Sequence, residues 1–255
     1  MHFSRASGHT LRARQQRLHA RRARRAATLI ILASALLVTF ALTAFASSPA
    51  PVRENQPAPA DRLVPPGPPS PTVIARVGRL PLQLPVPEER VTAIGYHAAG
   101  SGALTLDPVG RQANQGLLAR LAHRVFGGGD QGMAYYQLSG GEGPNTGALN
   151  VGAPSGTAVY APVDGIVLGL SDFVLNGRTY GVRMTLQPVS APSVTVSVTR
   201  LEADPTLKIG STITAGTRKI GTILDLSRVE RQALAGYTQD AGNHVQIEVR
   251  PALAP

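Results

Sequence analysis

The side chains of this sequence that could hold a metal ion or move a proton are few. The chain contains six histidines and no cysteine, and only His97, His123 and His244 follow the basic N-terminal region. Without cysteine there is no thiolate nucleophile, no thiolate metal site and no disulfide. Neither a His-x-x-x-His pair nor a G-x-S-x-G elbow occurs, so no pattern indicates a relocated metal centre or a serine hydrolase.

His244 stands two residues before Gln246 in the run NHVQIEVR, which has the alternation of a strand. Residues i and i+2 of a strand point to one face, so we expect these two side chains to share a surface. Imidazole is a common zinc ligand, whereas the neutral amide of glutamine is a poor one. The remaining histidines and three carboxylates are interpreted as surface, strand-end or hairpin residues: His97, His123, Asp164, Asp172 and Glu248.

The elements that must position these side chains are short strands. From Val151 onward, apolar runs alternate with glycine, proline and Asp-Gly, which is typical of an all-β sandwich or barrel. Asp164-Gly165 predicts a hairpin, and residues 226–237 predict a helix. Upstream, the pattern predicts a helix at 111–126 and strands at 91–97, 104–106 and 133–138.

Before the β-rich part, the sequence carries the pattern of a membrane anchor. Residues 26–46 read AATLIILASALLVTFALTAFA, without charge or proline, and about 20 apolar residues suffice to cross a bilayer. Eight arginines precede this run. The positive-inside rule therefore predicts a cytoplasmic tail at 1–25, a single transmembrane helix and an extracytoplasmic C-terminal domain. The alternative is a signal peptide cleaved between Ala46 and Ser47, which would release a secreted domain.

The positive charge of the chain belongs to its N-terminal region. Nine arginines and no acid precede Glu54, so the net charge of +10 leaves +10 − 9 = +1 for the remainder. We therefore expect no nucleic-acid partner for the folded part, and the membrane as the partner of the tail.

Residues 47–90 hold 12 of the 21 prolines. This composition favours polyproline II and predicts a disordered, proline-rich stalk or linker. Beyond it, we expect an accessory α+β region at 91–145 and a β-domain at 146–255.

Three blocks of the β-rich part, in the right order, resemble the LytM/lysostaphin-like zinc endopeptidases. They are NVGAPSGTAVYAPVDG at 150–165, KIGSTITAGTRKIG at 208–221 and NHVQIEVR at 243–250. The resemblance implies a mostly β, barrel-sandwich-hybrid-like (LytM-type) domain with a duplicated hybrid motif. It also implies relatives that cut peptide cross-bridges in the peptidoglycan of bacterial cell walls. It does not extend to the stalk or to residues 91–140.

The resemblance implies where a zinc site would be, and the residues needed there are replaced. The two histidines and the aspartate that hold zinc in the family fall on Thr146, Asn150 and Gln246, which offer neutral oxygens only. The catalytic histidines of the family fall on Arg200 and on His244, of which only His244 is kept. We expect these five residues to line a binding cleft that has no metal, no cofactor and no catalytic residue, and in which Arg200 pairs with a carboxylate.

The sequence therefore predicts a catalytically inactive binding or scaffolding module of the cell envelope, with peptidoglycan or an envelope protein as its partner. Two alternatives stay open. One is an active zinc endopeptidase of the cell wall, whose zinc-site residues lie at other positions than those matched to the family above. The other is a biotinyl/lipoyl-like adaptor of a membrane transport complex, because that fold shares the hairpins of APVDGIV and IGSTITAGTRKIG.

Overall fold

The computed structural model describes residues 67–115, 132–140 and 142–252. The chain divides into two units, Met1–Ala58 and Pro59–Pro255, and every described residue belongs to the second unit. The predictions of a tail at 1–25 and a membrane helix at 26–46, and the interpretation of His123, lie outside the described residues. Among the residues that are described, no helix has the length and apolar character needed to cross a bilayer.

The described part consists of strands joined by turns, with one short 3-10 helix, η2 (Glu88–Arg90). The strands that precede residue 140 are β1 (Val73–Val77), β2 (Leu80–Gln83), β3 (Ala93–His97), β4 (Asp107–Pro108), β5 (Arg111–Gln112) and β6 (Ala134–Gln137). The later strands are β7 (Ala148–Gly152), β8 (Ala158–Tyr160), β9 (Gly165–Leu175), β10 (Arg178–Pro188), β11 (Val194–Ala203), β12 (Thr212–Ile213), β13 (Lys219–Ile223) and β14 (His244–Pro251). The prediction of a mostly β fold is confirmed.

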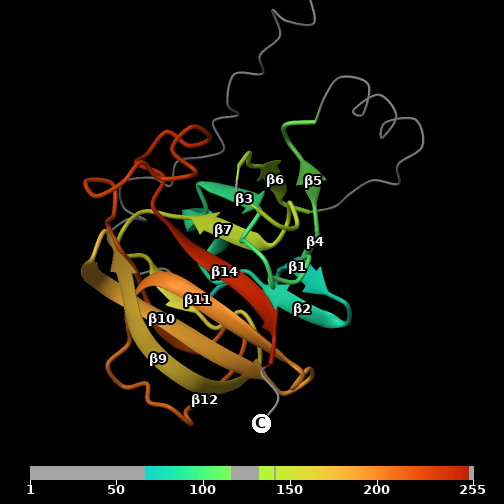
Figure 1. Ribbon diagram of the computed structural model, residues 1–255, viewed down its shortest axis with the longest axis vertical. Helices are drawn as coiled ribbons and strands as arrows, with labels where there is room; N and C mark the ends of the chain where they lie inside the picture. The colour runs from blue at the N-terminus through green and yellow to red at the C-terminus, as the bar shows by residue number, and fades with distance from the viewer. Residues whose placement is uncertain (1–66, 116–131, 141, 253–255) are drawn as a thin grey trace, which may run out of the picture. The chain divides into compact units, whose positions relative to one another are not determined.

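Most of these strands belong to one sheet, in the order β12-β9-β10-β11-β14-β7-β3-β6-β5, with β13 pairing to both β11 and β8. Strand β14 crosses the centre of Figure 1 in red and lies between β11 and β7, antiparallel to both. Strand β3 continues the sheet beyond β7. The sheet therefore crosses the expected boundary between an accessory region at 91–145 and a β-domain at 146–255.

One face of the sheet forms the apolar core. Along β14, Val245, Ile247 and Val249 have no exposed surface. The same alternation on the neighbouring strands buries Leu149, Val151, Val196, Val198, Met184 and Leu186. Because successive side chains of a strand point to opposite faces, the residues between them project from the other face of β14 and β7. That other face carries the candidate site.

Residues 67–90 are not the disordered stalk that their prolines predict. Strands β1 and β2 form an antiparallel pair, and the large apolar side chains of this stretch are buried: Leu80, Leu82, Leu84 and Val86. The phenol of Tyr96 on β3 donates a 2.6 Å hydrogen bond to the carbonyl oxygen of Ile74 on β1. Prolines are tolerated because β2 is an edge strand of its sheet, where Pro81 has no ladder bond to lose.

The predicted helix at 226–237 is wrong, since these residues form consecutive turns. One helix-type bond forms, from the N–H of Glu230 to the carbonyl oxygen of Leu226, and the side-chain amide of Gln232 holds the turns together by donating to the carbonyl oxygens of Leu226 and Glu230. The predicted helix at 111–126 begins instead with strand β5, and residues 116–131 lie outside the described part. Of the upstream strands, those at 91–97 and 133–138 are found as β3 and β6, whereas 104–106 lies outside any strand.

The hairpin predicted at Asp164-Gly165 is also wrong, because β8 and β9 on either side of it do not pair with each other. The carboxylate of Asp164 accepts a hydrogen bond from the backbone N–H of Ala215 instead. The long β9–β10 hairpin turns at Asn176-Gly177, where both residues have positive φ. An Asn-Gly pair suits such a turn because both residues tolerate the left-handed region.

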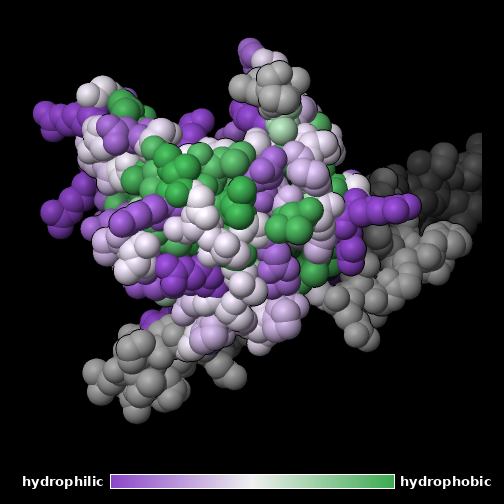
Figure 2. All heavy atoms as spheres, turned by 90° about the horizontal axis from the view of Figure 1, so that it is seen from below, coloured by the Kyte–Doolittle hydropathy of each residue, from purple (hydrophilic) through white to green (hydrophobic). Residues whose placement is uncertain are grey.

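Large apolar side chains stay exposed on β9 and in loops: Leu168, Val174, Val189, Ile209 and Tyr237. Figure 2 shows hydrophobic residues gathered over part of the face seen from below, beside hydrophilic ones. Tyr237 lines both of the hollows that adjoin the candidate site.

Candidate functional site

Strands β7 and β14 bring three of the five residues named by the resemblance, Asn150, His244 and Gln246, onto one face of the sheet. Asn150 lies directly opposite Gln246 on β14 and opposite Gly95 on β3. Opposed residues of antiparallel strands project to the same face, so the two amide side chains are neighbours. His244, two residues before Gln246, projects from that face as well.

His97 joins this group from β3. Its Nε2 lies 3.2 Å from Oδ1 of Asn150, and its Nδ1 lies 2.8 Å from the carbonyl oxygen of Ala98. The side-chain amide of Gln246 donates instead to the carboxylate of Glu248, at 2.7 Å. His97, interpreted from the sequence as a strand-end residue, is thus a member of the site. No spacing in the sequence links it to Asn150, because the register of β3 against β7 is a tertiary property.

His244 is the first residue of β14 and is 2% exposed. Its Nδ1 lies 2.9 Å from the carbonyl oxygen of Gly242. A carbonyl only accepts, so Nδ1 carries the proton and donates. Nε2 is buried and has no hydrogen-bond partner among the described residues. Burial, and after it the positive charge of Arg200 and the nearby His97, lowers the pKa of His244 to about 3, so the ring is neutral near pH 7 and Nε2 presents a lone pair.

Arg200 lies where β11 changes its partner. Strand β11 pairs with β14 up to Thr199 and with β13 from Leu201 onward. Against β10, the step from Val198 to Leu201 opposes the shorter step from Met184 to Val182, so β11 carries one extra residue, a β-bulge. Bulges redirect side chains and are frequent beside functional sites.

The backbone of Arg200 has a φ of 67°. This left-handed region costs roughly 1–2 kcal/mol for a residue that carries a Cβ. A strained residue of this kind persists only where its surroundings hold it in place.

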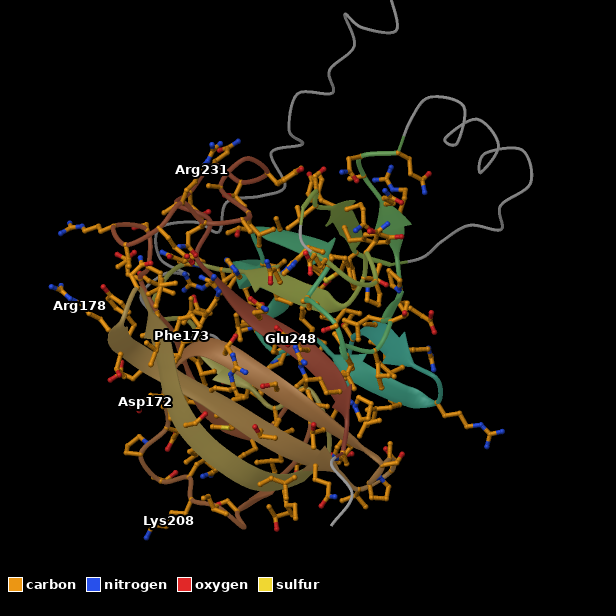
Figure 3. The ribbon with its side chains drawn as sticks, viewed as in Figure 1. Asp172, Phe173, Arg178, Lys208, Arg231 and Glu248 are labelled. Carbon is orange, nitrogen blue, oxygen red and sulfur yellow. The ribbon has the colours of Figure 1, made fainter. Side chains whose placement is uncertain are left out.

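The guanidinium of Arg200 is held mainly by the loop between β13 and β14, which we call the 224–243 segment. Its Nη1 lies 2.6 Å from Oε1 of Glu230 and donates to Oε1 of Gln232 at 3.2 Å. The guanidinium carbon lies 5.6 Å from the ring centroid of Phe173 on β9, which Figure 3 labels. A fixed positive charge therefore stands at the position that the resemblance gives to a catalytic histidine.

The 224–243 segment, drawn as orange-red loops at the upper left of Figure 1, packs onto the sheet through Leu234. Leu234 of this segment is fully buried and packs with Ala93 and Leu138. Two glycines of the sheet leave room for it. A Cβ on Gly95 would lie 2.7 Å from Cδ2 of Leu234, and one on Gly152 would lie 3.0 Å from its Cδ1. The cleft that the resemblance implies is thus closed at its His244 end.

Two open hollows adjoin the 224–243 segment. One, of about 380 Å³, is lined by His97, Ala98, Leu138, Ser139, Gly140, Ala233 and Tyr237. The other, of about 460 Å³, is lined by Arg231, Gln232, Ala233, Gly236 and Tyr237. His97 connects the first hollow to Asn150, and Gln232 connects the second to Arg200.

Thr146, the remaining residue named by the resemblance, lies in the turn before β7. Its carbonyl oxygen accepts a hydrogen bond from the N–H of Leu106. Within the described structure, no hydrogen bond joins its side chain to the other four residues. Thr146 is therefore not tied to the polar cluster.

Three residues that contact Arg200 were not identified from the sequence: Phe173, Glu230 and Gln232. Glu230 and Gln232 fall inside the predicted helix at 226–237. Their contacts with Arg200 join distant parts of the chain, so no local pattern in the sequence indicates them.

The side chains at the implied metal positions do not fit zinc. Within the ranges that the structure describes, no group of three or more His, Cys, Asp or Glu side chains is placed to hold a metal ion. Asn150 and Gln246 present neutral amides that are already engaged with His97 and Glu248, and Arg200 adds a cation. Toward a ligand, these side chains offer hydrogen bonds and an ion pair.

No protein-family model and no curated protein matches the sequence. The chain is similar to solved structures, one of which is the SpoIIQ–SpoIIIAH pore forming complex, with 14% identity over 71% of this chain and 85% of that chain and a TM-score of 0.36. Another is the catalytic domain of lysostaphin from Staphylococcus simulans, with 16% identity over 48% and 81% and a TM-score of 0.30. A third is a zinc containing peptidase from Vibrio cholerae, with 19% identity over 42% and 28% and a TM-score of 0.28.

The chain is thus similar in structure to M23 and lysostaphin-type peptidases, the group that its sequence resembles. It spans 25% of Csd3 from Helicobacter pylori, 37% of a lysostaphin and 28% of the Vibrio cholerae peptidase.

Proposed function

We propose that this protein is a binding or scaffolding module of the cell envelope, built on a LytM-like β-domain without catalytic activity. The observation that carries the proposal is the pair of amides at two implied metal positions. Asn150 and Gln246 lie opposite each other on adjacent strands, and Oδ1 of Asn150 lies 3.2 Å from a histidine nitrogen. Zinc sites use imidazole, thiolate or carboxylate ligands, and without the ion no water is activated for hydrolysis.

The surroundings of Arg200 support the same proposal. The position that the resemblance gives to a catalytic imidazole holds a guanidinium paired with Glu230 at 2.6 Å. The remaining family-equivalent imidazole, His244, is buried and hydrogen-bonded to Gly242 of the 224–243 segment. A cleft of this composition binds a ligand through hydrogen bonds and an ion pair and leaves it intact.

The location of the protein belongs to the proposal as well. Residues 26–46 anchor the chain in the cell membrane, with residues 1–25 in the cytoplasm and the β-domain outside, as the arginine distribution favours. Peptidoglycan or an envelope protein is the partner within reach of a domain placed there.

Sedimentation of the full-length protein with purified peptidoglycan tests the proposal. We expect the protein to pellet with the polymer and to release no soluble fragments, whether or not a chelator is present. Release of fragments that a chelator abolishes would show a metallopeptidase and would overturn the non-catalytic function. Failure to pellet would exclude peptidoglycan as the ligand and leave an envelope protein.

Two variants sharpen this experiment. Replacing His97 with Ala removes a polar group that lines one hollow and contacts Asn150, and we expect weaker pelleting. Replacing the exposed Glu202 of β11 with Gln is the matched control, which should pellet like the unaltered protein.

A further inference from the structure

We propose that Tyr237 and the two hollows beside it form a saccharide-binding site, in which a sugar ring stacks on the exposed tyrosine ring. The ligand that this chemistry fits is the glycan strand of peptidoglycan. The inference rests on the proposed function, because it names the part of the polymer that the module holds.

Tyr237 lines both hollows, and so does Ala233. The hollows of about 460 Å³ and about 380 Å³ therefore adjoin each other along this pair of residues. Each lies within the range of roughly 300–1,000 Å³ that small-molecule sites occupy. A chain of linked sugar rings can thus run from one hollow into the other across Tyr237.

The ring of Tyr237 is held in place by packing and still reaches solvent. Its centroid lies 4.7 Å from that of Tyr136 on β6, and Tyr136 packs in turn against Ala93, Leu138 and Leu234. Tyr237 is nevertheless 36% exposed. A tyrosine held in this way offers a rigid contact surface at a small cost in conformational entropy. The negative face of its ring attracts the slightly positive C–H groups of a sugar ring.

Unused hydrogen-bonding groups surround the exposed ring. The hydroxyls of Tyr237 and Ser139 and the guanidinium of Arg231 belong to residues that line the hollows, and none of the three has a polar partner among the described residues. The side chain of Arg231 points away from the sheet (Figure 3). A hydroxyl donates and accepts, and a guanidinium donates. Together these groups match the hydroxyl and acetamido groups at the edge of an amino-sugar ring.

The surroundings of the hollows favour a saccharide over a peptide. An extended peptide most often binds by adding a strand to an open sheet edge, but β3 lies between β7 and β6, and β6 lies between β3 and β5. Among the described residues that line the hollows, none is acidic, and Arg231 is the one guanidinium or ammonium group. A neutral sugar chain needs neither a strand edge nor a charged partner.

Calorimetric titration of the full-length protein with tetra-N-acetylchitotetraose, a soluble chain of linked amino sugars, tests the inference. We expect saturable binding, and we expect an excess of the tetrasaccharide to release the protein from peptidoglycan. N-acetyl-Ala-Ala, the peptide control, should not bind. Absence of tetrasaccharide binding would overturn the inference, and so would binding of the dipeptide in its place.

Two substitutions of Tyr237 separate the ring from its hydroxyl. Tyr237→Ala removes the stacking surface, and affinity for the tetrasaccharide should fall about tenfold or more. Tyr237→Phe keeps the ring, so its affinity should fall only about threefold. Val189→Ala removes an exposed apolar side chain that lines neither hollow, and this matched control should leave the affinity unchanged. A folded Tyr237→Ala protein with full affinity would contradict the assigned ring.

Tyr237→Trp provides a readout that keeps an aromatic ring in place. The chain contains no tryptophan, so the emission of this variant reports on position 237 alone. We expect the tetrasaccharide to shift the emission to shorter wavelength, because a stacked sugar ring displaces water from the indole. Val189→Trp should show no shift, and an unresponsive Tyr237→Trp protein would overturn the inference.

The outcome is distinguishable from that of the peptidoglycan experiment. Pelleting with peptidoglycan without binding of the tetrasaccharide would remove this inference and leave the proposed function standing. Binding of the tetrasaccharide at Tyr237 without pelleting would keep the saccharide site and remove peptidoglycan as the ligand of the proposed function.

Discussion

Nε2 of His97 lies 3.2 Å from Oδ1 of Asn150, a residue 53 positions further along the chain on an antiparallel strand. An imidazole therefore stands next to a position where the resemblance implies a metal-binding carboxylate. On the other side of Asn150, the register of β7 against β14 places Gln246. These three side chains lie together without the charge that a zinc ion needs.

Replacing Asn150 with Asp and Gln246 with His tests this geometry. The two changes supply a carboxylate and a second imidazole beside His97, which completes a ligand set of the kind zinc prefers. We expect roughly one zinc per chain in the double variant, measured by metal analysis after desalting, and none in the unaltered protein.

A third change, His97→Ala in the double variant, serves as the control and should abolish zinc binding. Tight stoichiometric zinc in the unaltered protein would contradict the non-catalytic function. A folded double variant that holds no zinc would show that the three side chains do not converge.

The low pKa of His244 predicts that the protein loses stability as the pH falls. A histidine with an unperturbed pKa near 6.5 binds a proton in the unfolded chain, whereas in the folded chain its pKa is about 3. Between these two values the unfolded state binds more protons. The free energy of unfolding should therefore fall by about 1.4 kcal/mol per pH unit from this group, an effect absent above pH 6.5.

Urea unfolding at pH values from about 7 down to about 5 measures this slope before the carboxylates titrate. The carboxyls of Asp204 and Asp225 have lowered pKa values, for which hydrogen bonds from Thr206 and Ser227 are the first cause, so they contribute only at lower pH. His244→Gln should remove most of the slope. An unchanged slope in that variant would mean that the buried ring is not its source.

The left-handed backbone of Arg200 predicts an unusual order of stability for two substitutions. Gly and Ala at position 200 both lose the contacts with Glu230 and Phe173. Gly alone adopts a φ of 67° without strain, so we expect the Gly variant to be more stable than the Ala variant by about 1 kcal/mol. Chemical denaturation gives both free energies.

Thr199, the preceding residue of β11, provides the comparison. Positive φ values among the described non-glycine residues are confined to Asn176 and Arg200, so Gly at position 199 should be less stable than Ala. The same order at both positions would contradict a left-handed conformation at Arg200.

Packing of Leu234 over Gly95 predicts that two destabilising changes partly cancel. Gly95→Ala brings a methyl group to 2.7 Å from Leu234, and overpacking of this kind costs about 1–3 kcal/mol. Leu234→Ala removes a fully buried side chain, which costs about 2–5 kcal/mol. In the double variant the methyl group enters the vacated space, so the loss should be smaller than the sum of the single losses.

Denaturation of the four proteins in this cycle measures the coupling. Gly169→Ala is the control, because no atom lies within 4 Å of the added methyl group, and it should show no coupling with Leu234→Ala. Additive losses for Gly95 and Leu234 would indicate that the 224–243 segment does not rest on β3.

Local alternation was enough to predict a mostly β chain and to place His244 and Gln246 on one strand. A period of two is a property of each strand alone and can be seen without knowing its neighbours. The types of residue at the implied zinc positions were also visible in the sequence, because they depend on matching three blocks and on nothing that folding adds.

Prolines hid another alternation. Along β2, Leu80 and Leu82 are buried and Pro81 and Gln83 are partly exposed, which is the same period of two, but the prolines of this stretch indicated a disordered stalk. Such prolines are compatible with a strand only at a sheet edge, and the position of β2 at an edge is a tertiary fact.

The composition of the site was decided by tertiary structure. His97 reaches Asn150 only through the register of β3 against β7, and Arg200 is placed by the bulge where β11 changes partners. Glu230 meets Arg200 because the 224–243 segment folds into turns over the sheet instead of the expected helix. These contacts join residues far apart in the chain, and they follow from which apolar faces are buried together, a choice that no short stretch of sequence contains.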